Sequence, residues 1–348
     1  MTIERPRRLP RPTGDPELDE RLAAFVDALD PIDQRIALEA VSTLIQLARD
    51  DDVSRLDRKI ANTALKEMRH AFKVFAPYRD THKVTIFGSA RTHKDEADYA
   101  TARDFAKEMA ARGWMVITGA GPGIMEAGHE GAAAEFSIGV GILLPFEAAP
   151  NPVIADDPKL MNFKYFFTRK LMFIKESDAF VLLPGGFGTM DEAFELLTLT
   201  QTGKSDLHPI VLLDAPGGTY WRSFERFIRD ELLTRRFIDE SDFGLYLVTD
   251  DINEAVAEIE RFYRVYHSER YVGSKLVLRL NRAPSDELLA QLSEEFSDVV
   301  DGPIERVEAS PAEIRDNDVP HLPRIALGFD RAHTGKLRRL IDRLNDMP

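Results

Sequence analysis

The sequence predicts an α/β protein built around a doubly wound, Rossmann-like parallel sheet, with a helical N-terminal extension and a small α+β C-terminal appendage. Three observations lead to this prediction. Short β-branched runs alternate with amphipathic helical segments from Thr81 onward. These runs are apolar throughout, as in strands that helices cover on both faces. The chain also has 348 residues, of which 44% are hydrophobic, enough for a sizeable core and more than one domain.

Residues 1–80 have a helical pattern and form the predicted N-terminal extension. Asp15-Pro16-Glu17 is a favourable helix start, because an aspartate cap precedes a proline at the first helical position. A second helix is expected from Pro31, and a third over about 54–75. The first dozen residues are rich in Arg and Pro, and we expect them to be a surface arm.

Residues 81–267 form the predicted Rossmann-like domain. Strands are expected at 84–87, 115–118, 138–144, 179–183, 210–213 and 245–248. The helices expected between and after them span 99–112, 124–135, 166–176, 189–200, 221–234 and 252–266. The remaining part, residues 268–348, has the order βαββα, with strands at 275–280, 304–308 and 325–329 and helices at 285–299 and 334–344.

Charge and composition exclude several classes of function. The 45 Lys and Arg against 59 Asp and Glu give a net charge of −14, which disfavours nucleic acids and anionic membranes as partners. There is no cysteine, so disulfides, thiolate catalysis and cysteine zinc sites are excluded. The N-terminal residues have no apolar stretch of the signal-peptide type. We therefore expect a soluble cytoplasmic protein.

Glycine-rich turns follow three of the predicted strands, beginning at Gly88-Ser89, at Gly119-Ala120-Gly121-Pro122-Gly123 and at Pro184-Gly185-Gly186-Phe187-Gly188-Thr189. Ligands of open parallel sheets bind beyond the carboxyl ends of the strands, and glycine lets a phosphate approach the backbone amides at a helix N-terminus. A single such turn also arises from chain geometry alone. None of the three is a P-loop or a convincing dinucleotide fingerprint, so NAD chemistry is disfavoured.

Charged side chains accompany the third turn. Glu192 lies early in the next helix, where it either complements the helix dipole or points into the ligand crevice. Arg169-Lys170 lie among aromatic residues on the preceding helix, and a guanidinium beside aromatic rings suits a flat anionic ligand. Glu126 and His129 have the spacing of a metal-binding pair, but a second pair is missing. We therefore expect no metal, and a surface or dimer-contact role for His129.

The sequence resembles the LOG ("Lonely Guy") family in four stretches. They are Phe87–Arg91, Gly119–Ala127, the pair Arg169-Lys170 and the motif PGGxGTxxE from Pro184 to Glu192, and the likeness covers about residues 80–267. It implies hydrolysis of the N-glycosidic bond of nucleoside 5′-monophosphates, without a cofactor, by a homodimer or larger homo-oligomer. The alternative is a non-catalytic nucleotide or molybdenum-cofactor carrier of the same fold. A pyridoxal phosphate decarboxylase is disfavoured, because no lysine lies in a recognisable cofactor motif.

The resemblance also assigns roles to residues. It implies that Arg169 and Glu192 are the catalytic pair, and that the 5′-phosphate is held by Gly185, Gly186, Gly188 and Thr189. Further contacts to the nucleotide are expected from Gly88, Ser89, Gly121, Pro122, Gly123, Met125, Phe166 and Lys170. The chain departs from the compact family members at Ala120, Glu126 and Phe166-Phe167. These departures concern the side of the base, and the choice of base stays open.

Overall fold

A computed structural model describes residues 15–29, 33–144 and 149–347. The chain divides into two compact units, one ending at Arg69 and the other beginning at His70. The first unit contains α1 (Pro16–Asp27), α2 (Gln34–Arg49) and most of α3 (Arg55–Phe75). The Asp15 carboxylate accepts hydrogen bonds from the amides of Glu17 and Leu18, which confirms the predicted helix start. Pro31 and the basic arm lie outside the described residues.

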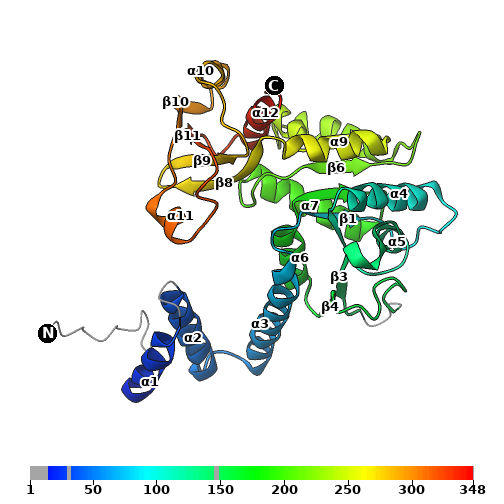
Figure 1. Cartoon of the computed structure of the whole chain (residues 1–348). Helices are drawn as coiled ribbons and strands as arrows, with labels where there is room; N and C mark the ends of the chain where they lie inside the picture. Colours follow the sequence, from blue (N-terminus) through cyan, green and yellow to red (C-terminus); the bar gives the residue numbers. More distant parts are fainter. Residues whose placement is uncertain (1–14, 30–32, 145–148, 348) are drawn as a thin grey trace. The chain divides into compact units, whose positions relative to one another are not determined.

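A seven-stranded parallel sheet forms the centre of the second unit, with the strand order β4-β3-β2-β1-β5-β6-β7 (Figure 1). Its strands are β1 (Lys83–Phe87), β2 (Met115–Thr118), β3 (Ser137–Ile142), β4 (Leu160–Phe163), β5 (Ala179–Leu182), β6 (Ile210–Leu213) and β7 (Leu247–Thr249). The central pair β1 and β5 is in register from Val84 opposite Ala179 to Phe87 opposite Leu182. Every residue of these two strands is buried, as their apolar runs predicted.

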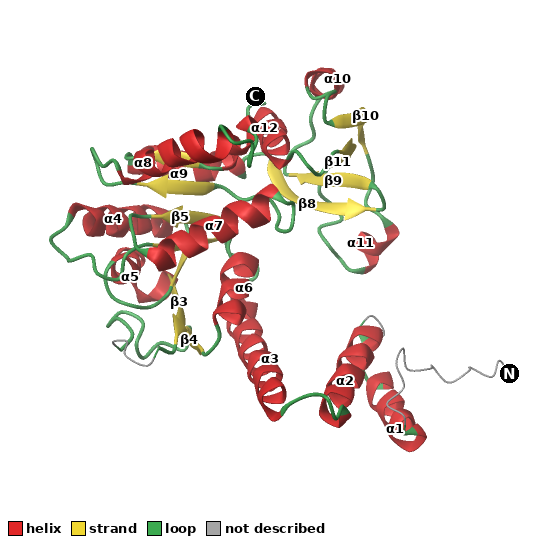
Figure 2. Ribbon diagram, turned by 180° about the vertical axis from the view of Figure 1, so that it is seen from behind, coloured by secondary structure: helices red, strands yellow, loops and turns green. Residues whose placement is uncertain are grey.

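Helices cover both faces of this sheet, as Figure 2 shows from behind. One face carries α4 (Ala97–Ala111), α5 (Ile124–Phe136) and α9 (Ile252–Phe262), packed on inward residues such as Val84 and Ile86. The other carries α6 (Phe166–Glu176), α7 (Phe187–Gln201) and α8 (Tyr220–Phe227). There the Phe87 ring meets the Phe173 ring at 4.9 Å between centroids. The predicted doubly wound α/β architecture is confirmed.

A four-stranded antiparallel sheet follows, with the order β10-β11-β9-β8. Its elements are β8 (Tyr266–Val272), β9 (Lys275–Leu280), α10 (Asp286–Glu295), β10 (Val300–Arg306), α11 (Pro311–Arg315), β11 (Arg324–Phe329) and α12 (Thr334–Asn345). Leucines of β9 form one core with apolar residues of α10 and α12. This core also includes Phe262 at the end of α9, so the second sheet packs directly against the last helix that follows the parallel sheet.

A buried cluster of ion pairs connects the short helix α11 with the strands β9 and β11. The Glu313 carboxylate accepts from the guanidinium groups of Arg279 at 2.9 Å and Arg324 at 3.4 Å, and all three side chains are almost fully buried. Burial alone would raise the pKa of Glu313, but hydrogen bonds from Ser310 and Arg279 lower it to about 2. The carboxylate is therefore charged at any physiological pH. Together with the Asp318 carboxylate, 2.5 Å from Arg279, it balances the two buried cations.

Several elements differ from the sequence predictions. The strands β4 and β8 and the helix α11 were not predicted. The helix expected over 252–266 ends at Phe262, and the one expected over 221–234 is α-helical only to Phe227, continuing as a π-helix (η2, Ile228–Leu233). Both missed strands lie at sheet edges, where one side is not paired and a continuous apolar run is not required. Short 3₁₀ turns occur at Ala76–Tyr78 (η1) and Glu240–Leu245 (η3). The three-part domain division stays a prediction.

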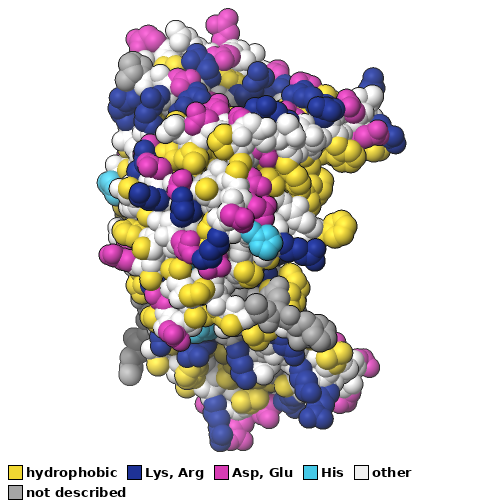
Figure 3. All heavy atoms as spheres, turned by 90° about the vertical axis from the view of Figure 1, so that its right-hand side faces the viewer, with side chains coloured by type: hydrophobic (Ala, Val, Ile, Leu, Met, Phe, Trp, Pro, Cys, Tyr) yellow, Lys and Arg dark blue, Asp and Glu magenta, His cyan; other side chains and the backbone are white. Residues whose placement is uncertain are grey.

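On the surface of the face in Figure 3, basic and acidic side chains are intermingled rather than separated into fields of one sign. Across the part of the chain that the structure describes, no helix combines the length and the apolar character needed to cross a bilayer.

Candidate active site

The central strands β1 and β5 are the topological switch point of the parallel sheet. They are neighbours, yet β1 is followed by α4 on one face and β5 leads into α7 on the other. A crevice must therefore open at their carboxyl ends, and this is where open α/β sheets bind ligands. A cavity of about 760 Å³ lies there. It is a volume typical of small-molecule sites.

The cavity brings together most of the residues predicted from the sequence. Its lining includes Gly88, Ser89, Met125, Phe166, Arg169, Gly185, Gly186, Gly188, Thr189 and Glu192. The predicted contacts Gly121, Pro122, Gly123 and Lys170 do not line it. Sequence reasoning did not assign the further lining residues Phe87, Ala90, Arg91, Gly119, Phe187, Met190, Asp191 and Tyr220. Arg91 and Gly119 lie within the strand-end motifs, whereas nothing in the local sequence of Tyr220 signalled a place in this cavity.

The glycine turn after β5 offers backbone amides to the cavity. The helix α7 begins at Phe187 with Gly186 as its N-cap, and its first bond back to the turn runs from the Met190 amide to the Gly186 carbonyl at 3.1 Å. The amides of the first helical turn consequently have no acceptors within the helix, and they form the positive end of its dipole. A Cβ atom added at Gly186 or Gly188 would meet no atom within 4 Å. This open backbone is suited to an anionic group such as a phosphate.

Gly185 is a glycine because of close packing and not because of an unusual φ angle. It does not have a positive φ, but an added Cβ atom would lie 2.1 Å from Thr189 Oγ1. A left-handed glycine occurs instead in the second turn, where Gly123 has φ +68°. There an added Cβ would lie 2.4 Å from the Ser89 carbonyl. Ala120, which replaces a family glycine, also has a positive φ of 63°, a conformation that disfavours a residue with a Cβ.

Glu192 lies on the cavity wall and is only 8% exposed. Because α7 begins two residues earlier than predicted, Glu192 belongs to the second helical turn and not the first. Glu192 is therefore too far along the helix to stabilise the N-terminal end of the helix dipole strongly, because this stabilisation fades beyond the first turn. Burial raises the pKa of Glu192 to about 7, although the charges of Lys170 and Arg169 oppose the rise. A carboxyl group with this pKa can exchange a proton near neutral pH.

The Arg169 guanidinium enters the cavity from α6. Its Nε donates to the Val140 carbonyl at 3.0 Å, and its charge lies 5.2 Å from the centroid of the Phe173 ring. This agrees with the predicted aromatic surroundings. A Cβ added at Gly119 would lie 2.6 Å from Arg169 Nη2. The glycine at the end of β2 therefore makes room for the guanidinium.

Lys170 contacts the acidic face of α7. Its ammonium lies 2.8 Å from the Asp191 carboxylate, 2.5 Å from Glu195 and 3.9 Å from Glu192. The structure thus places Lys170 beside the carboxylates of α7, behind the cavity wall. At this position its positive charge opposes the rise in the pKa of Glu192, and its role as a nucleotide contact stays a prediction.

His129 is fully buried, so the expected surface or dimer-contact role is wrong. Its ring contacts Thr118 Oγ1 at 3.0 Å and Asn151 at 3.2 Å, and Asn151 Nδ2 donates to the Gly121 carbonyl at 3.1 Å. Burial lowers the pKa of His129 to about 4, so the ring is neutral at pH 7. These bonds anchor the second glycine turn from behind.

The predicted partner of His129, Glu126, forms an ion pair with Lys94 at 2.9 Å. Within residues 15–29, 33–144 and 149–347, no three His, Asp or Glu side chains are grouped as a metal site would require.

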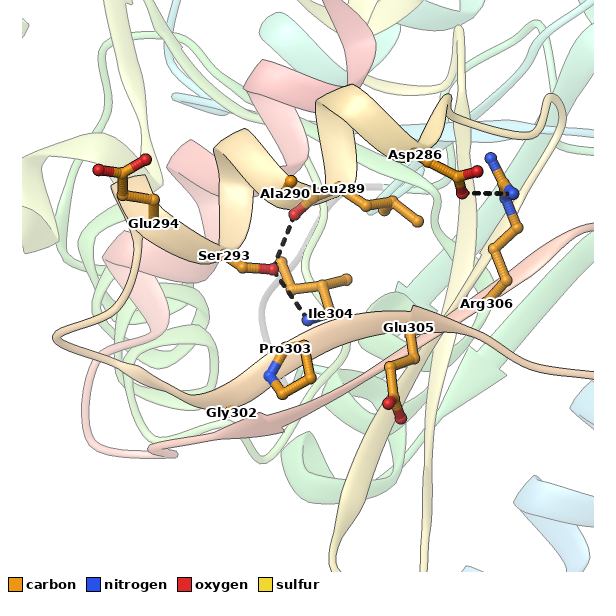
Figure 4. A pocket seen from close by; sticks show the side chains of 10 residues that line it. All are labelled: Asp286, Leu289, Ala290, Ser293, Glu294, Gly302, Pro303, Ile304, Glu305 and Arg306. Carbon is orange, nitrogen blue, oxygen red and sulfur yellow. Dashed lines mark hydrogen bonds and ion pairs between the residues drawn. The ribbon is translucent and has the colours of Figure 1, made fainter.

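Two other cavities lie away from the carboxyl edge of the parallel sheet. One of about 720 Å³ lies between α10 and β10 (Figure 4). Its side chains bond to one another: Ser293 Oγ accepts from the Ile304 amide at 2.9 Å, and Arg306 pairs with Asp286 at 2.7 Å. The other, of about 1000 Å³, lies at the amino edge of the sheet, where β1 and β5 begin, near His82 and Asp178. Parallel sheets bind ligands at the opposite edge.

Known proteins match the part of the chain that builds this site. A family model described as "Possible lysine decarboxylase" matches residues 122–259. The cytokinin riboside 5′-monophosphate phosphoribohydrolases LOG3 and LOG4 of Arabidopsis thaliana are 28% and 27% identical to the chain over 190 and 210 residues. These matches span 52% of this chain and 82% of LOG3, and 58% of this chain and 90% of LOG4.

Over about half of its length, the chain is similar to proteins of the LOG family. The phosphoribohydrolase LOG of Oryza sativa subsp. japonica is 29% identical over 187 residues, 51% of this chain and 72% of that relative. Among solved structures, a molybdenum cofactor binding protein from Rippkaea orientalis has 18% identity and a TM-score of 0.36 over 52% of this chain and 96% of its own. The Moco carrier protein from Chlamydomonas reinhardtii has 21% identity and a TM-score of 0.35 over the same shares. The LOG-family matches cover about half of this chain, so the helical extension and the second sheet lie largely outside them.

Proposed function

We propose that the protein hydrolyses the N-glycosidic bond of nucleoside 5′-monophosphates, such as AMP or a cytokinin riboside 5′-monophosphate, to give the free base and ribose 5-phosphate. One observation carries this proposal. The open amides of the turn at Gly185–Thr189, the buried acid Glu192 and the guanidinium of Arg169 line the same cavity. The names of the LOG relatives, which are phosphoribohydrolases of this substrate class, support it.

In the proposed mechanism the phosphate binds the amides of Gly186 and Gly188 and the N-terminus of α7. This remote contact positions the ribose, because binding energy from a group that does not react can orient the one that does. Cleavage of the glycosidic bond passes through a ribosyl cation of oxocarbenium character. The C1′–N bond breaks and the base leaves with its electron pair, while water adds to C1′. The Glu192 carboxylate stabilises the cation and accepts a proton from the attacking water, and a proton is returned to the departing base nitrogen, so that the free base is released. Arg169 binds on the other wall, against the ribose, the phosphate or the departing base.

The ionisation of Glu192 sets a pH dependence for this mechanism. The carboxylate is the active form, and its pKa is about 7. We therefore expect kcat/KM to fall below pH 7 in proportion to the deprotonated fraction, giving about a tenfold loss at pH 6 relative to the alkaline plateau.

Incubation with AMP and chromatographic measurement of free adenine tests the reaction. Glu192→Ala should lower kcat by at least about a hundredfold while AMP still binds, because the phosphate contacts are intact. Glu294→Gln on α10 is a matched control that removes a remote carboxylate. Wild-type protein that binds AMP without releasing adenine would favour the alternative, a non-catalytic nucleotide or cofactor carrier. Comparison of AMP, GMP, CMP, UMP and isopentenyl-adenosine monophosphate identifies the preferred base.

A homodimer in the cytoplasm is part of the proposal. Large apolar side chains are exposed beside the cavity: Phe187 is 96% exposed, Phe167 56%, Phe166 49% and Phe194 40%. An apolar group of this kind next to a ligand site is typical of surfaces that a second subunit covers. Sedimentation velocity should give twice the mass of the chain, and Phe194→Asp should shift the distribution toward the monomer.

A further inference from the structure

Tyr220 reaches the glycine turn from a different strand connection. It is the first residue of α8, in the connection after β6, and 35 residues separate it from Gly185 in sequence. Its hydroxyl donates to the Gly185 carbonyl at 2.6 Å, and Met190 Sδ lies 3.4 Å from the Tyr220 hydroxyl oxygen. Tyr220 also lines the cavity. A side chain from the neighbouring connection therefore holds the turn at the peptide that precedes α7.

The start of α8 is itself held firmly. The Asp214 carboxylate, directly after β6, accepts from the Trp221 amide at 3.0 Å, and the Trp221 side chain is fully buried. The Gly217 amide donates to Asp250 Oδ2 at 2.8 Å. The ring of Tyr220 stands edge-on to that of Trp221, with 4.9 Å between centroids. The position of the hydroxyl thus depends on β6 and the loop after β7, and not on the turn that it contacts.

The hydroxyl determines the orientation of one peptide group. A trans peptide is planar, and its C=O and N–H point in opposite directions. Fixing the Gly185 oxygen therefore also fixes the direction of the Gly186 N–H. Glycine on both sides of this peptide makes rotation easy, and a rotated peptide would present a carbonyl dipole to the bound anion instead of an N–H. The helix does not prevent this, because its first bond to the turn uses the Gly186 oxygen.

We propose that Tyr220 is a positioning residue for a phosphate monoester: its hydroxyl holds the Gly185–Gly186 peptide in the orientation that receives the phosphate. This inference rests on the proposed function and adds to it a residue outside the four family motifs. Tyr220 is 37% exposed, while Trp221 and Phe224 anchor α8 in the core. Loss of the hydroxyl alone therefore leaves the packing of the helix in place.

The decisive variant is Tyr220→Phe, with Tyr246→Phe as the matched control. The Tyr246 hydroxyl is buried without a hydrogen-bond partner, and this tyrosine is not part of the cavity. Calorimetric titration with ribose 5-phosphate measures the phosphate contact separately from catalysis. We expect Tyr220→Phe to weaken ribose 5-phosphate about tenfold, the effect of one good hydrogen bond, and Tyr246→Phe to leave it unchanged. The KM for AMP should rise by the same factor, with kcat within about twofold of wild type.

Adenosine, which lacks the phosphate, separates positioning from a general structural role. Its slow hydrolysis should be equal in Tyr220→Phe and wild type. Unchanged binding of ribose 5-phosphate by Tyr220→Phe, or an equal loss with AMP and adenosine, would overturn the assignment while leaving the proposed function intact. Wild-type protein that binds neither AMP nor ribose 5-phosphate would overturn both.

Discussion

Glu192→Gln should make the protein more stable at alkaline pH. The folded protein raises the pKa of Glu192 from its ordinary value of 4.5 to about 7, because burial disfavours the charged form. Below pH 4.5 the side chain is protonated in both the folded and the unfolded chain, and burial of the charge costs nothing. As the pH rises through 7, the folded protein must carry a buried carboxylate, and the stability associated with the protonated form is lost.

The size of this effect follows from the two pKa values. The interval from 4.5 to about 7 corresponds to about 3 kcal/mol of unfolding free energy, at 1.36 kcal/mol for each pKa unit. Glutamine has nearly the shape of the protonated acid and stays neutral. We therefore expect Glu192→Gln to match wild type at pH 4.5 and to exceed it by about 3 kcal/mol at pH 8.

Urea unfolding of both proteins at pH 4.5, 6, 7 and 8 measures this difference, and Glu294→Gln controls for loss of an acid elsewhere. The Glu192→Gln variant should also be inactive, because it gains stability by losing the catalytic carboxylate. A stability difference that is the same at every pH would show that Glu192 does not titrate near neutrality. That result would also remove the physical basis for its role as a base.

Three further predictions concern charged or titratable groups. Lys170→Met removes a positive charge 3.9 Å from Glu192, so the fall of kcat/KM on the acid side should begin about 1 pH unit higher. An unchanged pH profile would contradict an electrostatic interaction between Lys170 and Glu192. Glu313→Gln removes the carboxylate that Arg279 and Arg324 share, while Arg279 keeps its ion pair with Asp318, and it should cost about 3 kcal/mol in urea unfolding at pH 7. Because the pKa of Glu313 is lowered to about 2, its contribution is present above pH 4.5 and declines as the pH falls toward 2, where wild type and variant should converge. The pKa of His129 is lowered from 6.5 to about 4, so wild-type stability should fall by about 3 kcal/mol between these values as the pH decreases. His129→Gln should flatten this slope in the same unfolding assay, and an unchanged slope would assign it to other groups.

Local signals in the sequence were sufficient for the parts of the fold and site that depend on neighbouring residues. The strands β1 and β5 are buried on both sides, and their continuous apolar runs therefore identified them. The glycine turns could be recognised because a close approach of the backbone excludes any Cβ, as at Gly185 and Gly123. Since parallel strands share one carboxyl edge, the alternation of strands and helices was also enough to predict that these turns meet.

Only the tertiary structure decided the contacts between segments far apart in the chain. The bond from Tyr220 to Gly185 depends on β6 lying beside β5, and the placement of Lys170 against Glu192 depends on α6 packing along α7. The burial of His129, like the pKa of Glu192, reflects the loss of water caused by all surrounding elements together. The sequence by itself thus determined which chemical groups are present and at which strand ends they lie. Their protonation, partners and orientation were decided by the assembled fold, because desolvation and hydrogen bonding depend on distance in space and not on separation along the chain.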